Sequence, residues 1–170
     1  MKKTVVIIAG IVICLWIISI ITGFSFFVVN QKYEPVKKNF HIGDTIQPFK
    51  EFDFNKDNWK AYLVISREDF IDLNSSIKKV NCLKTSNKDV LQKMKQTWFF
   101  IYRESDMATV TSSIYLLKNG KLVFTSGIVL DNKIEGLQGR EFGWIKPIHQ
   151  NALSQTCKDF ERIYCPIVFL

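Results

Sequence analysis

The sequence predicts an α+β protein, with an N-terminal transmembrane helix followed by a domain that has a mostly antiparallel sheet and about three helices. Three observations support this. Residues 5–29 contain no charged side chain. Asn119-Gly120 joins two long apolar-rich runs. The segments that begin at Ser66 and Ser86 carry apolar residues at helical spacing. The predicted divisions are a short tail at 1–4, a transmembrane signal anchor at 5–29, a stalk at 30–58 and an α+β soluble domain at 59–170.

The composition indicates a folded domain and not a nucleic-acid binder. Hydrophobic residues make up 47% of the chain, which suffices for a core even without the anchor. The formal net charge is +7, but the basic residues are dispersed and only four of them are arginine. Nucleic-acid-binding domains usually gather Lys and Arg on one face. We therefore expect no nucleic-acid partner.

The run from Val5 to Val29, with Trp16 near its middle, predicts a membrane anchor. Its 25 residues would rise about 37 Å as a helix, enough to cross a hydrocarbon core of about 30 Å. A cleaved signal peptide has a shorter apolar region of about 7–15 residues that ends in small residues. This run ends in phenylalanines, and Cys14 follows isoleucine and not the small residue of a lipoprotein signal. The lipid bilayer is thus the first expected partner.

The orientation of the anchor is less constrained, because lysines flank both of its ends. A short tail with Lys2 and Lys3 before a long apolar run is typical of an uncleaved signal anchor. We therefore place the domain outside the cytoplasm, in the periplasm of a bacterium whose inner membrane holds the helix. The opposite topology would set the lysines after the anchor against anionic headgroups.

The first half of the domain is predicted to form a strand followed by two helices. Residues 30–58 have two prolines and no lasting periodicity, hence the predicted stalk. Trp59 to Ser66 predicts a strand buried on both sides. Ser66 then resembles the start of a capping box, and a helix is predicted from Arg67 to Val80. A shorter helix follows Ser86. Its predicted apolar stripe consists of Val90, Leu91 and Met94.

The next segments predict the sheet. Thr97 to Arg103 has no polar face and is interpreted as a central strand. Asn119-Gly120 favours a two-residue type I′ hairpin loop, since both residues tolerate positive φ. The resulting register pairs Leu117 with Leu122 and Tyr115 with Phe124. Neither hairpin face is polar, so we expect helices on one face and a second layer or a partner on the other.

The C-terminal part predicts a turn, a strand, a third helix and a last strand. The glycines between residues 133 and 147 match no phosphate-binding motif and indicate a turn followed by a strand. Asn151 is expected to cap a helix that carries Leu153, Cys157, Phe160 and Tyr164 on one face. The apolar residues 167–170 after the proline are expected to add a strand to the sheet.

Three cysteines lie outside the anchor, namely Cys82, Cys157 and Cys165. An oxidising compartment would pair two of them. Cys157 and Cys165 on one straight helix would lie about 12 Å apart, beyond the reach of a disulfide. The predicted disulfide therefore joins Cys82 to Cys157 or to Cys165, and three reduced thiols are the alternative in a cytoplasmic domain.

The sequence favours binding over catalysis. His41 and His149 have no cysteine or histidine at metal-ligand spacing, so no metal site or cofactor is expected. The main hypothesis is a non-catalytic domain that binds another protein at the membrane surface, in toxin immunity, exclusion or an accessory role in an envelope complex. Its candidate interaction surface is aromatic and consists of Tyr115, Phe124, Phe142 and Trp144.

Two alternatives remain open. The order of strand, short helices and three-strand meander is similar to that of PAS-like sensor domains, although no motif is shared. That resemblance implies a small-ligand pocket between the sheet and the helices that begin at Ser66 and Ser86. An enzyme of the envelope would instead need a cleft in which His149 has a polar partner within hydrogen-bond reach.

Overall fold

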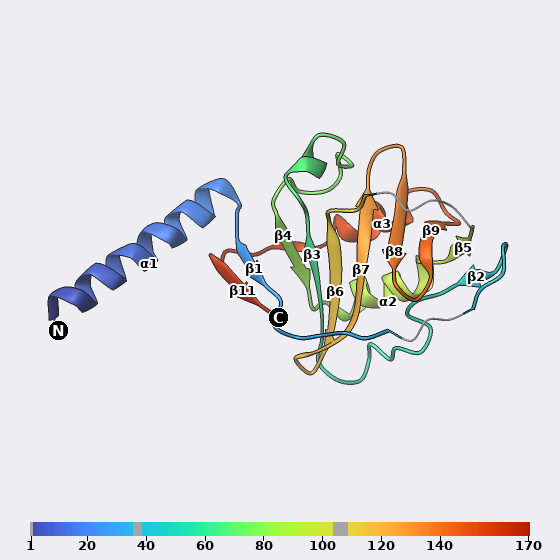
Figure 1. Cartoon of the computed structure of the whole chain (residues 1–170), viewed down its shortest axis with the longest axis horizontal. Helices are drawn as coiled ribbons and strands as arrows, with labels where there is room; N and C mark the ends of the chain where they lie inside the picture. The colour runs from blue at the N-terminus through green and yellow to red at the C-terminus, as the bar shows by residue number, and fades with distance from the viewer. Residues whose placement is uncertain (1, 36–38, 104–108) are drawn as a thin grey trace.

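The computed structural model describes residues 2–35, 39–103 and 109–170. A long N-terminal helix leads into a nine-stranded antiparallel sheet, and a separate two-stranded sheet lies beside the base of that helix (Figure 1). The helices are α1 (Lys2–Thr22), α2 (Lys88–Thr97) and α3 (Ala152–Cys157). The strands are β1 (Phe26–Val28), β2 (Thr45–Ile46), β3 (Trp59–Val64), β4 (Cys82–Thr85), β5 (Phe100–Tyr102), β6 (Ser113–Lys118), β7 (Lys121–Leu130), β8 (Glu135–Gly139), β9 (Gly143–Pro147), β10 (Glu161–Arg162) and β11 (Ile167–Phe169). This architecture confirms the predicted α+β class.

The large sheet has the strand order β10-β4-β3-β6-β7-β8-β9-β5-β2, and each neighbouring pair is antiparallel. Most neighbours are also close in sequence. The four strands β6 to β9 form a continuous meander (Figure 1). The fold therefore arises largely from hairpins, of which the clearest is the one that the sequence predicts at Asn119-Gly120.

That hairpin has the predicted loop but a different register. Asn119 and Gly120 have φ angles of 52° and 79°, as a type I′ loop requires. Leu117 pairs with Leu122 as predicted, but the next pair is Leu116 with Phe124, so one residue of β7 is bulged out. Tyr115 consequently pairs with Thr125 and not with Phe124. A one-residue shift moves side chains to the opposite face of a strand.

The main core lies between the large sheet and α2 and α3. The side chains of Leu91, Met94 and Trp98 on this helical side are fully buried together with Phe49. Val90 is also buried, which confirms the predicted apolar stripe of the second helix. The stripe fills the face of the sheet that the helices cover.

The second face of β3, β4 and β6 is covered by the small sheet. Strand β1 pairs with β11 in parallel, with Phe27 opposite Val168. These two side chains join a second apolar cluster that also includes Cys82, Leu117 and Tyr115. The hairpin therefore packs on helices with one face, as expected, and a second layer made from the two ends of the domain covers part of the other.

Two predicted boundaries are wrong at the N-terminal side. The anchor helix ends at Thr22 and not at Val29, because Gly23 adopts φ 69° and the following residues pair as β1. The segment 30–58 is not a free stalk, although residues 36–38 of it lie outside the described residues. Phe49 and Phe54 are buried in the main core, and β2 pairs with β5. Burial of these aromatic side chains makes the segment part of the domain.

The predicted helix from Arg67 to Val80 is also wrong. Only Glu68–Phe70 forms a short 3-10 turn. Polar side chains here bond locally or to other strands, and such bonds compete with a helix. The Asn74 side chain accepts from the Ser76 main-chain amide at 3.1 Å, and the Asn74 main-chain N–H donates to the Leu130 carbonyl at 2.8 Å. Strand β4, which the sequence did not indicate, follows this loop.

Three further predictions need correction. The aromatic segment predicted as a central strand is β5, which lies next to the edge strand β2. The third helix ends at Cys157, because Glu161 and Arg162 pair with β4 as an edge strand. The last strand pairs with β1 and not with the large sheet. Each difference arises from a strand pairing between segments distant in sequence, which periodicity cannot reveal.

Candidate functional site

The four aromatic residues predicted as an interaction surface do not form one. Phe124, Phe142 and Trp144 expose only 2%, 4% and 6% of their surface. Tyr115 is half-buried, and its ring lies 5.2 Å from that of Phe27. The bulge also sends Tyr115 and Phe124 to opposite faces of the sheet. These residues are packing elements in this fold, and the candidate site lies elsewhere.

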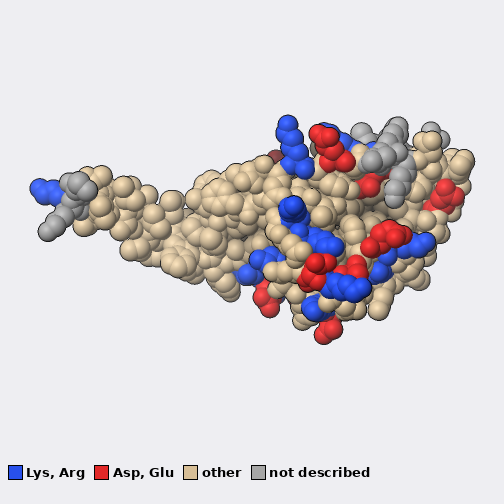
Figure 2. Space-filling view, turned by 90° about the horizontal axis from the view of Figure 1, so that it is seen from below, with Lys and Arg blue, Asp and Glu red and all other residues tan. Residues whose placement is uncertain are grey.

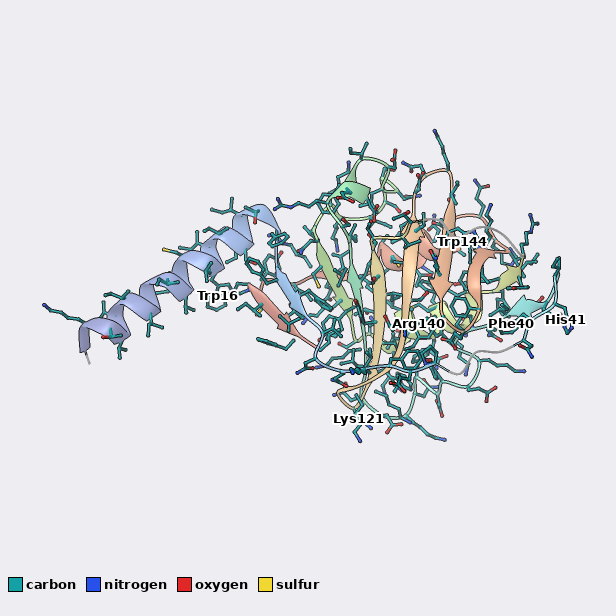
Figure 3. All side chains as sticks on the ribbon, in the orientation of Figure 1. Trp16, Phe40, His41, Lys121, Arg140 and Trp144 are labelled. Atoms are coloured by element: carbon teal, nitrogen blue, oxygen red, sulfur yellow. The ribbon has the colours of Figure 1, made fainter. Side chains whose placement is uncertain are left out.

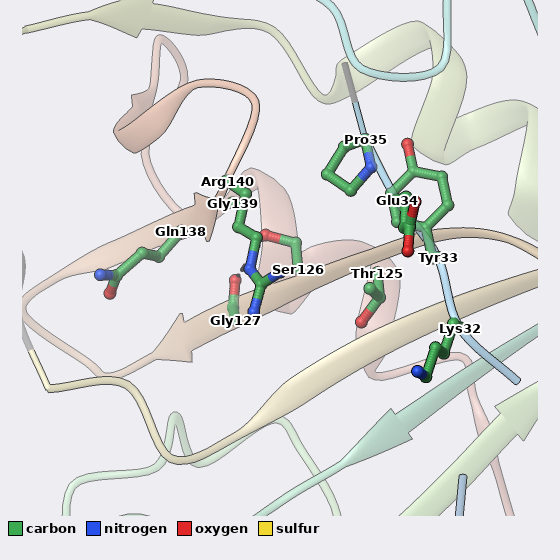
Figure 4. Close-up of a pocket in the computed structure, with 10 residues that line it drawn as sticks. All are labelled: Lys32, Tyr33, Glu34, Pro35, Thr125, Ser126, Gly127, Gln138, Gly139 and Arg140. Atoms are coloured by element: carbon green, nitrogen blue, oxygen red, sulfur yellow. Dashed lines mark hydrogen bonds between the residues drawn. The ribbon is translucent and has the colours of Figure 1, made fainter. Parts of the chain in front are cut away.

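An open groove lies on the face of β7 and β8 opposite the helices. It has a volume of about 520 Å³ and is shown in Figure 4. A second hollow of about 580 Å³ continues from it toward β6 and shares Gly127, Gln138, Gly139 and Arg140. We call the two together the outer groove. Its first part is lined by Lys32, Tyr33, Glu34, Pro35, Thr125, Ser126, Gly127, Gln138, Gly139 and Arg140.

One wall of the outer groove is the segment 32–35, which is fixed against the hairpin. The side chain of Gln31 donates to the Gly120 carbonyl at 2.9 Å and accepts from the Leu122 amide at 2.8 Å. The Gln31 side chain thus satisfies main-chain groups of Gly120 and Leu122 that a neighbouring strand would otherwise bond. The wall is therefore held by the hairpin tip and does not depend on its own secondary structure.

Tyr33 fastens the same wall to the loop between β8 and β9. Its hydroxyl donates to a carboxylate oxygen of Glu141 at 3.3 Å, and its ring lies 6.4 Å from that of Phe124. Burial, followed by the charge and the hydrogen bond of Glu141, raises the pKa of Tyr33 to about 12. The phenol is thus neutral throughout the physiological range and acts as a donor.

The opposite wall and the floor supply polar groups. Arg140 is exposed, and no ion pair of its guanidinium is found among residues 2–35, 39–103 and 109–170. The carboxamide oxygen of Gln138 is buried and has no hydrogen-bond partner within the same described ranges. In Figure 4 the guanidinium of Arg140 lies over Gly127, whereas Gln138 points away from the segment 32–35. Of these groups, the exposed Arg140 guanidinium is the one that the groove offers to a polar ligand.

Neither histidine belongs to the outer groove. His41 is exposed at the end of the molecule opposite α1, with Nδ1 3.7 Å from an Asp44 carboxylate oxygen (Figure 3). His149 is exposed in the loop before α3. Within the described part of the chain, no group of three or more His, Cys, Asp or Glu side chains could hold a metal ion.

A smaller hollow gathers acidic side chains that the sequence analysis did not connect. It has a volume of about 110 Å³, and its carboxylates come from Glu68, Asp69, Asp72 and Asp131. Asp69 accepts hydrogen bonds from the hydroxyls of Thr111 and Ser112. The carboxylate thus links the loop after β3 to the start of β6, which helps to explain why no helix forms around it.

The predicted disulfide is absent, because all four cysteines are free thiols. Cys82 and Cys157 are buried in the two separate apolar clusters, on opposite sides of the sheet. Cys165 is exposed beyond β10. Burial raises the pKa of Cys82 to about 12, and burial with the nearby Glu135 and Asp159 carboxylates raises that of Cys157. Both buried cysteines therefore behave as apolar packing groups.

The junction of α1 with the domain is held by a few specific hydrogen bonds. Helix α1 is long and apolar enough over Lys3–Thr22 to cross a membrane, by length and composition. It includes Val5 and Trp16, whereas Val29 lies beyond it. The indole of Trp16 donates to the Tyr164 carbonyl at 2.6 Å.

A cationic side chain closes the C-terminal end of α1. The guanidinium of Arg162 donates to the Ser19 carbonyl at 3.0 Å and also to the Ile20 carbonyl. A cation at this end of a helix is favourable, because it meets the carbonyls and the negative end of the dipole. The helix is thereby attached to β10 and not to a flexible linker.

No protein-family model, no curated protein and no solved structure matches the chain. The functional inferences below therefore start from the outer groove and from the junction between α1 and the domain.

Proposed function

We propose that this chain is a single-pass membrane protein of the bacterial inner membrane whose domain, outside the cytoplasm, binds another protein without catalysing a reaction. Toxin immunity, exclusion or an accessory role in an envelope complex would each use such a protein. The observation that carries the binding role is the outer groove, which is open, has charged side chains on its walls and is bounded by a wall that the hairpin holds in place.

The anchor supports the cellular location. Val5 to Thr22 is apolar and almost wholly exposed, as expected of a helix surrounded by lipid. Exposure of so many large apolar side chains in water would be unfavourable. The short tail with Lys2 and Lys3 before the helix supports an orientation with the domain outside. A reporter fused to the C-terminus tests this orientation.

The charges of the outer groove indicate what kind of segment it would bind. Arg140 and Lys32 are exposed cations on its two walls, with Glu34 next to Lys32. Arginine is common at the energetic centre of interfaces, because its planar group forms paired bonds with carboxylates. We therefore expect a partner segment that places a carboxylate against Arg140.

The alternatives have less support. The space expected for a small-ligand pocket is occupied, since Phe49, Leu91, Met94 and Trp98 fill the face of the sheet under α2. The helix expected from Ser66 does not form. His149 is exposed and lines neither the outer groove nor the acidic hollow, so neither of these supports the enzyme that its presence suggested.

Site-directed photo-crosslinking in the cell that makes the protein tests the binding role. A photoreactive residue at Lys32, on the wall of the groove, should give a discrete adduct with a second protein. The same residue at Lys121, on the exposed hairpin tip, is the matched control (Figure 3). We expect Arg140→Glu to reduce the Lys32 adduct by about tenfold, the effect of about 1.4 kcal/mol.

Lys133→Glu makes the same charge change on an exposed loop outside the groove and should leave the adduct unchanged. Equal adducts from Lys32 and Lys121, or an adduct that survives Arg140→Glu, would contradict binding in the groove. Absence of any adduct from either position in native membranes would contradict the protein-binding role itself.

A further inference from the structure

We propose that the outer face of the small sheet β1–β11 lies on the membrane, inserted at the boundary between headgroups and acyl chains beside α1. This inference rests on the proposed function, since it assumes that α1 is anchored in a bilayer. It adds a second, peripheral contact with lipid that would fix the orientation of the domain above the membrane.

The first observation is an exposed apolar surface on the small sheet. Phe26 pairs with Ile167 and Val28 with Phe169, so these four side chains share one face, while Phe27 and Val168 point to the domain. Phe26 exposes 57% and Phe169 66% of its surface. A contiguous face without a polar side chain is unusual on a soluble domain and indicates a contact with a partner or with lipid.

The second observation is the depth at which the small sheet meets α1. Trp16 bonds to the residue Tyr164, which precedes β11, and Trp16 lies six residues before the end of α1 at Thr22. Six residues of helix correspond to about 9 Å along its axis. The 20-residue span Lys3–Thr22 rises about 30 Å, which only just equals the hydrocarbon thickness.

A helix of this length is fully inside the membrane when it spans the bilayer. Residues level with Trp16 then lie at or below the membrane surface. Strand β11, which follows Tyr164, begins at that level. An apolar face inserted about 5–10 Å is the depth at which amphipathic surface elements bind membranes. Tyr164, 58% exposed, is of the residue type that favours this boundary.

The third observation is the distribution of charge. Figure 2 shows an uncharged surface that continues from α1 onto the adjoining end of the domain, and charged side chains appear only farther along. Cations also lie at the end of the domain next to α1. Lys78, Lys84 and Arg162 line a hollow of about 810 Å³ there, together with one acidic residue, Glu161. Cations at this level would face anionic headgroups.

Lipid is preferred over a protein as the occupant, because the apolar face is continuous with α1. Phe24 contacts Phe26 edge-on with ring centroids 5.3 Å apart and so connects the helix end to β1. The Arg67 guanidinium lies 4.7 Å from the centre of the Phe24 ring, at the border of this apolar surface. A second copy of the chain would need to reach the same face while its own helix crosses the membrane at its side. The experiment below separates these two occupants.

The test uses the full chain with Cys14→Ser and Cys165→Ser, the two exposed cysteines, reconstituted in vesicles of phosphatidylcholine and phosphatidylglycerol. A fluorescent label is attached at Phe169→Cys, and the lipids carry a nitroxide near the top of the acyl chain. Lys121→Cys on the hairpin tip is the control in water, and Ile11→Cys in α1 is the control in the membrane. We expect at least about threefold stronger quenching at 169 than at 121, as an insertion of about 5–10 Å requires.

Strong quenching at 11 and at 169, but not at 121, supports the proposal. Strong quenching at 11 with equal, weak quenching at 169 and 121 overturns it while the anchor stands. Weak quenching at all three positions overturns the anchor as well. Energy transfer between differently labelled copies at 169, without lipid quenching, assigns the face to a second copy and also overturns the proposal.

Discussion

The side-chain carboxamide of Asn81 forms two hydrogen bonds with the main chain of Ser25. The Ser25 amide donates to Oδ1 at 2.8 Å, and Nδ2 donates to the Ser25 carbonyl at 2.7 Å. Both residues are buried, and 56 positions separate them. The carboxamide thus replaces a neighbouring strand for the residue between α1 and β1, and it fixes the angle at which the chain leaves the helix.

Asn81→Ala should therefore loosen the junction. It leaves two buried main-chain groups of Ser25 without a partner, which costs about 1–3 kcal/mol for each such group. We expect faster hydrogen exchange at the amides of β1 and β11, measured on the full chain in micelles. Asn132→Ala, at an exposed turn, should leave that exchange unchanged. Equal exchange in both variants would contradict the role of Asn81.

Gly139 and Phe142 form a packing pair. A Cβ at Gly139 would lie 2.8 Å from the Phe142 ring, and its three nearest neighbours all belong to that ring. Gly139→Ala should lower the free energy of unfolding by about 1–3 kcal/mol through overpacking.

A double-mutant cycle measures this pair. Phe142→Leu gives the added methyl group space, so Gly139→Ala should cost less in that background than in the wild type. Denaturant unfolding of the four proteins gives the coupling. Strict additivity would show that Phe142 does not pack on Gly139, and would reopen its predicted place on an interaction surface.

The raised pKa of Tyr33 predicts that the free energy of unfolding falls in alkali. Its pKa is raised from 10.0 to about 12 in the folded protein, so between these values the unfolded chain loses its proton first. The stabilisation is complete below pH 10 and decreases as the pH rises toward 12. Tyr33→Phe should show a shallower decline of unfolding free energy in this range. An identical decline in both proteins would show that Tyr33 is not shielded at the wall of the groove.

The cysteines predict a simple labelling pattern. In the folded protein, a maleimide near neutral pH should label Cys165, whereas Cys82 and Cys157 should react only after unfolding, because both are buried and their thiols have raised pKa values. Peptide mass spectrometry identifies the labelled positions. If Cys165 reacted only after reduction, a disulfide would be present and the sequence-based prediction would be restored.

The sequence anticipated features that depend on neighbouring residues. The type I′ loop follows from Asn119-Gly120, since these two residues tolerate positive φ wherever they occur. The apolar stripe of α2 follows from Val90, Leu91 and Met94, whose spacing alone puts them on one helical face. The long apolar run likewise formed a helix, although it ends seven residues earlier than Val29.

The candidate site could not be predicted in this way. The outer groove needs the bulge that shifts β7 against β6, and it needs Gln31 to attach its wall to the hairpin tip. Both depend on packing between segments that are distant in sequence. The residues around Tyr33 have the composition of a linker. The hydrogen bond of Tyr33 to Glu141, which only the structure reveals, indicates that this segment forms a wall of the outer groove.

By itself the sequence determined the class of the protein: an apolar helix, a hairpin-rich domain and a helix that packs on the sheet. The tertiary structure decided where the chain ends meet, because the pairing of Phe26–Val28 with Ile167–Phe169 joins residues more than a hundred positions apart. The propensity of a short apolar segment is the same in a membrane helix, a stalk or a strand. The partner that satisfies its backbone hydrogen bonds decides between them, and that partner is fixed only when the whole chain folds.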